Sequence, residues 1–299
     1  MQSTLRRSVY FSGRGVHSGA PTRIAVRPAP RGHGIVFRRI DVVDGDPVVP
    51  ARWDGVTDTR LCTRLSNGDG IAVSTVEHLM AALAGLGVDN ARVDVDGPEL
   101  PILDGSAAPF VAAIREAGLA EEDAPRRAVR ILRRVAVESD GASAALEPAE
   151  RFEIDFEIDF PDAAIGRQRR ALAIDSESFV RELADCRTFA RRAEIEALRA
   201  AGLARGGDLR SAVVVDGARV LTPGGLRRPD EPVRHKILDA VGDLALAGGP
   251  IIGRYVGRRA GHGTTNRLLR ALFDRPDAWR WEPVSEARNA EVAERLAAE

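Results

Sequence analysis

Apolar residues recur along the chain with two periods, one typical of strands and one typical of helices. The clearest strand signal lies at 152–160, where Phe and Ile alternate with polar residues, mostly carboxylates, as on a strand with one buried face. Shorter apolar runs bounded by Gly, Pro or a turn predict further strands. These runs are 22–27, 35–39, 91–95 and 251–256, with a hairpin formed by 212–215 and 219–221.

Apolar residues spaced three and four apart predict helices in several other segments. One helix is expected to begin near Ser74, because Ser74 and Glu77 have the spacing of a capping box. Another is expected through 235–246, preceded by Asp230 and Pro232, which are good helix-starting residues. The remaining predicted helices span 108–117, 176–184, 191–201 and 264–273.

The two halves of the chain share one order of elements. In each half several strands precede a helix, a further strand and a last helix, which favours an α+β fold over a doubly wound parallel sheet. The polar segment 121–127 (EEDAPRR) contains a proline and has no periodicity, so it is the candidate linker. We therefore predict a first domain over 1–122 and a second domain over 127–299.

The composition is that of a packed protein without a strong net charge. A chain of 299 residues with 44% hydrophobic residues fits one or two globular domains, and its net charge of −1 argues against a nucleic-acid partner. Cys62 and Cys186 are too few for a disulfide framework. Neither a signal peptide nor the roughly 20 apolar residues of a membrane span are apparent, so we expect a cytoplasmic protein without an integral membrane segment.

Lys236 is the only lysine in the chain, and the other 42 of the 43 basic residues are arginine. Such a bias suggests that lysine remains where a compact point charge is needed in place of a planar fork. If 235–246 is helical, His235, Asp239 and Asp243 lie on one stripe, at i, i+4 and i+8. An imidazole and a carboxylate one turn apart can bind one metal ion, and Asp243 fits either a solvated position or one that orients a histidine.

His78, His235 and Asp239 together supply two nitrogen ligands and one oxygen ligand. Three protein ligands plus water is the ligand count of a catalytic zinc site, whereas structural zinc sites have a fourth protein ligand, often Cys. Fe(II) fits the same ligands. Glu77 precedes His78, and on a helix their side chains diverge by about 100°. Glu77 can therefore lie beside the ion and act as a general base without binding it.

Each candidate also has an ordinary structural interpretation, and the residues alone leave the choice open. A His and an Asp one helical turn apart are more often a surface pair than metal ligands. Glu77 has a sufficient role in a capping box, and His78 fits a hydrogen-bonded core position. His262 lies between two glycines, which indicates close approach of the backbone. His17 and His33 are assigned to the surface or to turns.

Five short segments occur in one order along the chain and resemble those of a single enzyme family. They are Thr75-Val-Glu-His-Leu, the block 100–110 (LPILDGSAAPF), Arg187-Thr-Phe, the block 233–239 (VRHKILD) and Gly261-His. Together they strongly resemble the zinc-dependent UDP-3-O-acyl-N-acetylglucosamine deacetylases of lipid A biosynthesis, over nearly the whole chain. One such motif is a weak signal, but five in order are very specific.

The resemblance implies a fold of two similar α+β domains. Each domain would have a mostly antiparallel sheet, and the helices would pack between the two sheets. An insert near 190–222 would guide the acyl chain of the substrate. The same resemblance assigns zinc to His78, His235 and Asp239, in agreement with the ligand count above.

The resemblance also implies roles for the remaining candidates. Glu77 becomes the general base, and His262 the acid or the cation that stabilises the oxyanion, supported by Asp243. Thr188 would direct its hydroxyl towards the oxyanion. Lys236 and Phe189 would contact the substrate, and which of Glu77 and His262 handles each proton transfer stays open.

The implied reaction removes the N-acetyl group of UDP-3-O-(3-hydroxyacyl)-N-acetylglucosamine as acetate, an early committed step of lipid A biosynthesis. The acylated UDP-sugar is the expected partner, and a monomer is expected. The alternatives are a metal-free binding protein on the same fold and a zinc amidohydrolase with another acylated substrate. Ala190, Arg191 and Asp208 depart from the family pattern, which leaves the preferred acyl length open.

Overall fold

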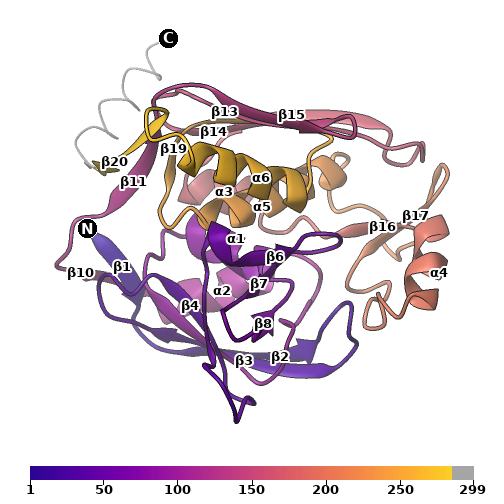
Figure 1. Ribbon diagram of the computed structural model, residues 1–299. Coiled ribbons are helices and arrows are strands. Elements are labelled where there is room, and N and C mark those ends of the chain that lie inside the picture. The colour runs from indigo at the N-terminus through magenta and orange to yellow at the C-terminus, as the bar shows by residue number, and fades with distance from the viewer. Residues whose placement is uncertain (285–299) are drawn as a thin grey trace.

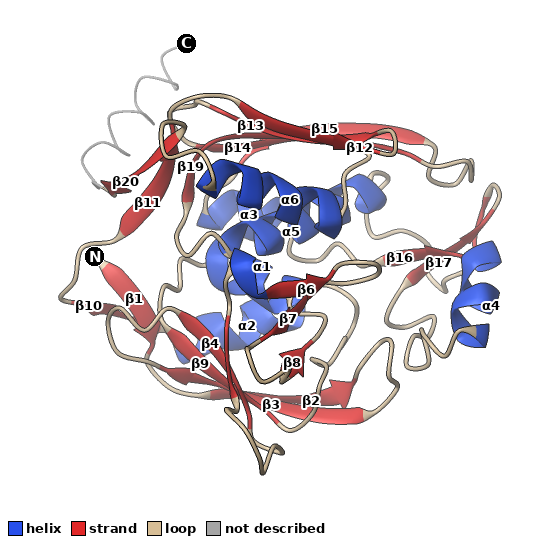
Figure 2. Cartoon of the chain, viewed as in Figure 1, coloured by secondary structure: helices blue, strands red, loops and turns tan. Residues whose placement is uncertain are grey.

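Two β-sheets enclose most of the helices, one sheet on each side (Figures 1 and 2). The computed structural model describes residues 1–284. Residues 285–299, which the predicted second domain includes, lie outside the described residues. The mixture of helices with mostly antiparallel sheets confirms the predicted α+β class, and the helices other than α4 lie between the sheets as the family resemblance implies.

The helices of the described chain differ in length and in burial. Their bounds are α1 (Glu77–Gly85), α2 (Ala108–Ala117), α3 (Ser176–Glu182), α4 (Arg192–Ala200), α5 (Glu231–Ala245) and α6 (His262–Phe273), with a 3-10 helix η1 (Trp53–Gly55). α5 is buried on nearly every side, whereas α4 has no buried residue. No helix within residues 1–284 is long and apolar enough to cross a membrane.

The N-terminal half is built on a five-stranded sheet. Its strands, in order across the sheet, are β2 (Val9–Arg14), β3 (Pro21–Pro28), β9 (Ala91–Val95), β4 (Ile35–Arg39) and β5 (Val48–Pro50). Neighbouring strands are antiparallel except β4 and β9, which are parallel. Short strands complete this half: β1 (Gln2–Leu5) with β10 (Leu119–Glu122), and β6 (Val56–Asp58), β7 (Arg64–Ser66) and β8 (Ala72–Val73).

The C-terminal half is built on a seven-stranded sheet with β19 inside it. Its strands are β11 (Arg127–Ile131), β12 (Val135–Ser139), β13 (Ala142–Glu147), β14 (Phe152–Asp159), β15 (Arg167–Ala173), β19 (Ile251–Arg258) and β20 (Trp279–Pro283). The alternation predicted at 152–160 is confirmed, because Ile154, Phe156 and Ile158 are buried. The predicted hairpin is also present.

A small sheet at one edge of the molecule carries α4 beside it (Figure 1). Its strands are β16 (Phe189–Arg191), β17 (Val213–Asp216) and β18 (Arg219–Val220). This segment coincides with the predicted insert near 190–222. That this segment guides the acyl chain of the substrate stays a prediction. The domain boundaries also stay a prediction.

Two local expectations from the sequence concern the segment between the halves and the start of α1. Residues 123–126 of the candidate linker connect β10 to β11, while its two ends belong to strands, because β10 extends to Glu122 and pairs with β1 and β11 begins at Arg127. The capping box of Ser74 and Glu77 does not form, since α1 begins at Glu77 itself and no side chain caps it. Ser74 remains extended and bridges to Glu99.

α1 and α5 cross at very short range in the centre of the molecule. A Cβ atom at Gly242 of α5 would lie 2.1 Å from the carbonyl oxygen of Glu77 and 3.1 Å from the amide nitrogen of Ala81, both in α1. Only glycine permits this approach of two backbones. The contact brings the first turn of α1 against the middle of α5, where the candidate ligands of both helices meet.

We predict that Gly242→Ala destabilises the protein by about 2 kcal/mol or more, because the added methyl group must push α1 and α5 apart. In a helix without this contact the same change would stabilise by about 0.5–1 kcal/mol. The sign of the change in urea-induced unfolding therefore tests the crossing. Gly68→Ala is the control, because a Cβ there meets nothing within 4 Å. A stabilised Gly242→Ala variant would contradict the prediction.

Candidate active site

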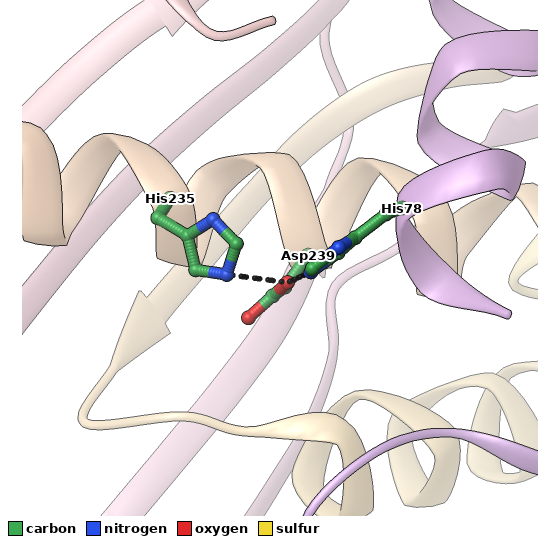
Figure 3. Close-up of side chains that lie close together, drawn as sticks. All are labelled: His78, His235 and Asp239. Carbon is green, nitrogen blue, oxygen red and sulfur yellow. Dashed lines mark ion pairs between the residues drawn. The ribbon is translucent and has the colours of Figure 1, made fainter. Parts of the chain in front are cut away.

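The three predicted metal ligands lie together where α1 meets α5. His78 comes from α1, and His235 and Asp239 come from successive turns of α5 (Figure 3). Oδ1 of Asp239 lies 3.3 Å from Nε2 of His235 and 3.6 Å from Nε2 of His78. All three residues are buried, and one ligand atom from each lies within 4.8 Å of the others. The helical spacing that suggested a shared stripe on α5 is thus realised.

Asp239 has the polar environment that a bound cation would complete. Lys236 Nζ donates a hydrogen bond of 2.7 Å to Asp239 Oδ2. Asp239 Oδ1 is buried, and no hydrogen-bond partner for it exists among the described residues. A buried carboxylate oxygen without a partner is costly. The donor set of two imidazoles and this oxygen therefore fits one divalent cation.

The surroundings of His235 suit the predicted role of a metal ligand. Its Nδ1 lies 3.0 Å from the carbonyl oxygen of Cys186 and donates to it, which leaves the lone pair of Nε2 facing Asp239. Burial lowers the pKa of His235 to about 4. The imidazole is therefore neutral at pH 7, as metal binding requires.

Glu77 lies beside the cluster with one oxygen held and the other open to the site. The backbone N–H of Thr63 donates to Glu77 Oε2 over 3.0 Å, while Oε1 lies 4.0 Å from Nε2 of His262. Glu77 does not have the capping role considered above. Thr75 has φ of 59° and α1 starts at Glu77, so the carboxylate is engaged by Thr63 and not by the N-terminus of the helix. Burial raises the pKa of the Glu77 carboxyl group.

His262 forms a buried pair with Asp243. Its Nδ1 lies 2.8 Å from Asp243 Oδ2, and the N–H donates to the carboxylate. Burial alone would lower the pKa of His262, but the charge and hydrogen bond of Asp243 raise it to about 9. His262 is therefore protonated at pH 7, with Nε2–H directed to the same side of the site as Glu77.

The predicted substrate-contacting residues lie around the same cluster. The Phe189 ring lies 6.4 Å from the His235 ring and 5.2 Å from the Phe160 ring. Burial alone would lower the pKa of Lys236, but Asp239 raises it, so the ammonium stays charged. Lys236 reaches the cluster itself, and its side chain is 17% exposed.

Thr188 is fixed by the N-terminal half. Its backbone N–H donates to the carbonyl oxygen of Gly105 over 2.8 Å. Gly105 has φ of 82°, and a Cβ there would lie 1.9 Å from the carbonyl oxygen of Ser211. Asp104 forms an ion pair of 3.0 Å with Arg227. The block 100–110 therefore serves as the docking surface of the N-terminal half for the segment that carries Thr188.

Two residues near the site were missed by reasoning from the sequence. Thr63 contacts both Glu77 and Asp243 but belongs to no motif. His17, which was assigned to the surface or a turn, is half-buried and has a buried Nδ1 without a partner in residues 1–284. Burial lowers its pKa, and His262 is among the charges that act on it. Both placements depend on contacts far apart in sequence, so no local pattern reveals them.

The chain is similar to known proteins of one family over most of its length. The family described as UDP-3-O-acyl N-acetylglycosamine deacetylase matches residues 2–274. The UDP-3-O-acyl-N-acetylglucosamine deacetylase of Phenylobacterium zucineum is 55% identical over 95% of this chain and 97% of its own length. Proteins of the same name from Acidithiobacillus ferrooxidans and Chromohalobacter salexigens are 48% and 47% identical, over 96% and 93% of this chain and 94% and 92% of theirs.

The His262–Asp243 pair predicts a specific change in titration. Without the Asp243 charge, burial and the Lys236 charge lower the pKa of the imidazole and only the Glu77 charge opposes them, so Asp243→Asn should lower the pKa of His262 clearly from about 9. NMR titration of the His262 ring in chelator-treated protein would measure this, with His262→Gln to assign the resonance. A pKa that stays near 9 would show that Asp243 is not the cause.

The same pair has a consequence for stability. Because the folded pKa of His262 lies above its unfolded value, the pair stabilises the fold fully below pH of about 6.5, and this contribution is lost as the pH rises through about 9. This contribution of His262 to the free energy of unfolding is on the order of 3 kcal/mol. Urea unfolding between pH 6 and 9 should show this slope in the wild type and a flatter one in Asp243→Asn.

Proposed function

The chain belongs to the family of UDP-3-O-acyl N-acetylglycosamine deacetylases, and from this premise we infer that it is the deacetylase of lipid A biosynthesis. It hydrolyses the N-acetyl group of UDP-3-O-(3-hydroxyacyl)-N-acetylglucosamine to the free amine and acetate. The observation that carries this function is the buried cluster of His78, His235 and Asp239, with a carboxylate oxygen that receives no hydrogen bond from residues 1–284, beside Glu77 and His262. The UDP-linked substrate favours a reaction in the cytoplasm.

The proposed cofactor is Zn²⁺, held by His78, His235 and Asp239, and Fe(II) suits the same donors. The ion, when bound, acts as a Lewis acid that lowers the pKa of a water and polarises the amide carbonyl. The protein supports it by keeping His235 neutral and by holding Asp239 through Lys236, so that Oδ1 remains available.

Glu77 is proposed as the general base. Its Oε2 is engaged by Thr63, and its Oε1 is left to accept the proton of the attacking water. The buried carboxylate has little solvent to stabilise its charge, and the raised pKa makes it a better proton acceptor than an exposed glutamate. The 4.0 Å between Glu77 Oε1 and His262 Nε2 brings base and acid to the same reacting centre.

His262 is proposed as the cationic acid. Its pKa of about 9 keeps it protonated at neutral pH, so it stabilises the anionic intermediate and donates the Nε2 proton to the departing nitrogen. An amide requires this step, because an unprotonated amine leaves poorly. Thr188 is proposed to share the oxyanion charge, and Lys236 and Phe189 to contact the substrate.

The function is tested by assaying the purified protein on the UDP-linked substrate, before and after chelation. Turnover should disappear with the metal and return with Zn²⁺, and elemental analysis should find one ion per chain. His235→Ala should lose the ion. An active preparation without metal would refute the mechanism, whereas full occupancy in His235→Ala would refute only the assignment of that ligand.

We predict that Glu77→Gln lowers kcat by about 10²–10⁴-fold. The amide oxygen can still accept the N–H of Thr63, so stability and metal content should stay near wild type. The amide cannot take a proton from water, so only the chemical step is lost. Steady-state kinetics with elemental analysis of the same preparation would measure this. Wild-type turnover would leave Glu77 with a structural role.

We predict that Lys236→Arg folds with normal metal content but loses at least about tenfold in kcat/KM, or ~1.4 kcal/mol of transition-state binding. The ammonium nitrogen lies 2.7 Å from Asp239 Oδ2. A guanidinium is larger and planar, so it cannot place the same compact charge at this position. Arg60→Lys is the control, because Arg60 is 86% exposed and its swap should be neutral. Unchanged kinetics would make the single lysine an accident of composition.

A further inference from the structure

Thr63 joins the two residues that are proposed to transfer protons. It precedes β7, is 1% exposed and donates through two groups. Its backbone N–H donates to Glu77 Oε2 over 3.0 Å, and its hydroxyl donates to Asp243 Oδ1 over 2.5 Å. Its carbonyl oxygen accepts from the N–H of Val76, immediately before α1. One residue thus contacts the carboxylates of both α1 and α5.

These hydrogen bonds belong to a series of contacts that runs from Thr63 through Asp243, His262 and Glu77 back to Thr63. Asp243 uses Oδ1 for the Thr63 hydroxyl and Oδ2 for the Nδ1–H of His262. His262 in turn directs Nε2 towards Glu77 Oε1, 4.0 Å away, and Glu77 uses its other oxygen for Thr63. The interval of 4.0 Å between Glu77 Oε1 and His262 Nε2 is the one step of this series that is longer than a hydrogen bond.

We propose that Thr63 is a positioning residue for the acid–base pair. Its hydroxyl fixes the carboxylate of Asp243 in the rotamer that holds His262, and so directs the Nε2–H of His262 at the leaving nitrogen. Its N–H fixes Glu77 with Oε1 free. The inference rests on the proposed function. In the reaction Glu77 gains the proton of the water, His262 gives one to the amine, and Thr63 neither gains nor loses a proton.

The hydroxyl can be removed without changing the shape of the side chain. Valine matches threonine in volume and branching, and it keeps the backbone N–H to Glu77, so Thr63→Val deletes only the bond to Asp243. We expect kcat to fall about 10–100-fold, as when other outer partners of a site are removed. KM and metal content should stay within about twofold. Thr63→Ser keeps the hydroxyl and should retain kcat within about threefold.

A matched control separates positioning from stability. Thr22 is also buried, and its hydroxyl donates to Asp96 Oδ1 over 3.3 Å in the N-terminal sheet. Thr22→Val therefore deletes the same type of bond away from the site. It should lower stability with kcat unchanged. Equal kcat in Thr63→Val and wild type would overturn the proposal.

The route of the effect is tested in a His262→Ala background. If Thr63 acts through Asp243 and His262, adding Thr63→Val there should lower the residual kcat by less than about threefold. If Thr63→Val lowered kcat in that background by the same factor as in the wild type, the hydroxyl would act elsewhere, and the proposal would be overturned. If Thr63→Val fails to fold, Thr63→Ala replaces it in the same comparisons.

A readout independent of turnover distinguishes this inference from the function on which it rests. The hydrogen-bonded Nδ1–H of His262 should give a downfield proton resonance in wild type and Thr63→Ser, and this resonance should broaden or shift in Thr63→Val. An inactive wild-type protein would refute the proposed function alone. An unchanged resonance in Thr63→Val would refute the positioning role, whatever the activity.

Discussion

The close crossing of α1 and α5 is the constraint on which the site depends. Gly242 lets the backbone of Glu77 approach α5 with no side chain between them. His78, one residue further along α1, then reaches Asp239, which is also within reach of His235 on the preceding turn of α5. A wider crossing would separate His78 in the N-terminal half from His235 and Asp239 in the C-terminal half. Folding and assembly of the proposed ligand set are therefore one event.

Each buried carboxylate of the site has one oxygen that accepts a hydrogen bond from the protein, and the other oxygen is available for the role proposed above. Among the described residues, Asp239 accepts from Lys236 through Oδ2 and accepts no hydrogen bond through Oδ1, and Glu77 accepts from Thr63 through Oε2 and leaves Oε1 open. Asp243 gives one oxygen to Thr63 and the other to His262. These three carboxylates lie with only two cationic side chains, Lys236 and His262, so one negative charge is in excess, which would favour the proposed cation.

Reasoning from the sequence succeeded where the signal was local and periodic. The strands at 35–39 and 91–95 and the helix at 108–117 have the predicted bounds, and the spacing of His235 and Asp239 anticipated their shared face. It failed where a tertiary contact outweighed a local motif. Ser74 and Glu77 have the spacing of a cap, but Glu77 is engaged by Thr63, 14 positions away. The pairing of Thr63 with Asp243 spans 180 positions, and no single-sequence pattern encodes it.

The segment Arg187-Thr-Phe shows why recognising a motif does not by itself assign its residues. Arg187 is buried and forms an ion pair of 2.9 Å with Glu231 at the start of α5. This pair fixes the segment against α5, so that the carbonyl oxygen of Cys186 meets Nδ1 of His235 and sets its tautomer. Thr188, in turn, is bonded to the N-terminal half. Loss of Arg187 would therefore disturb the proposed ligand His235, the proposed oxyanion contact Thr188 and the junction of the two halves together, without any contact between Arg187 and the substrate.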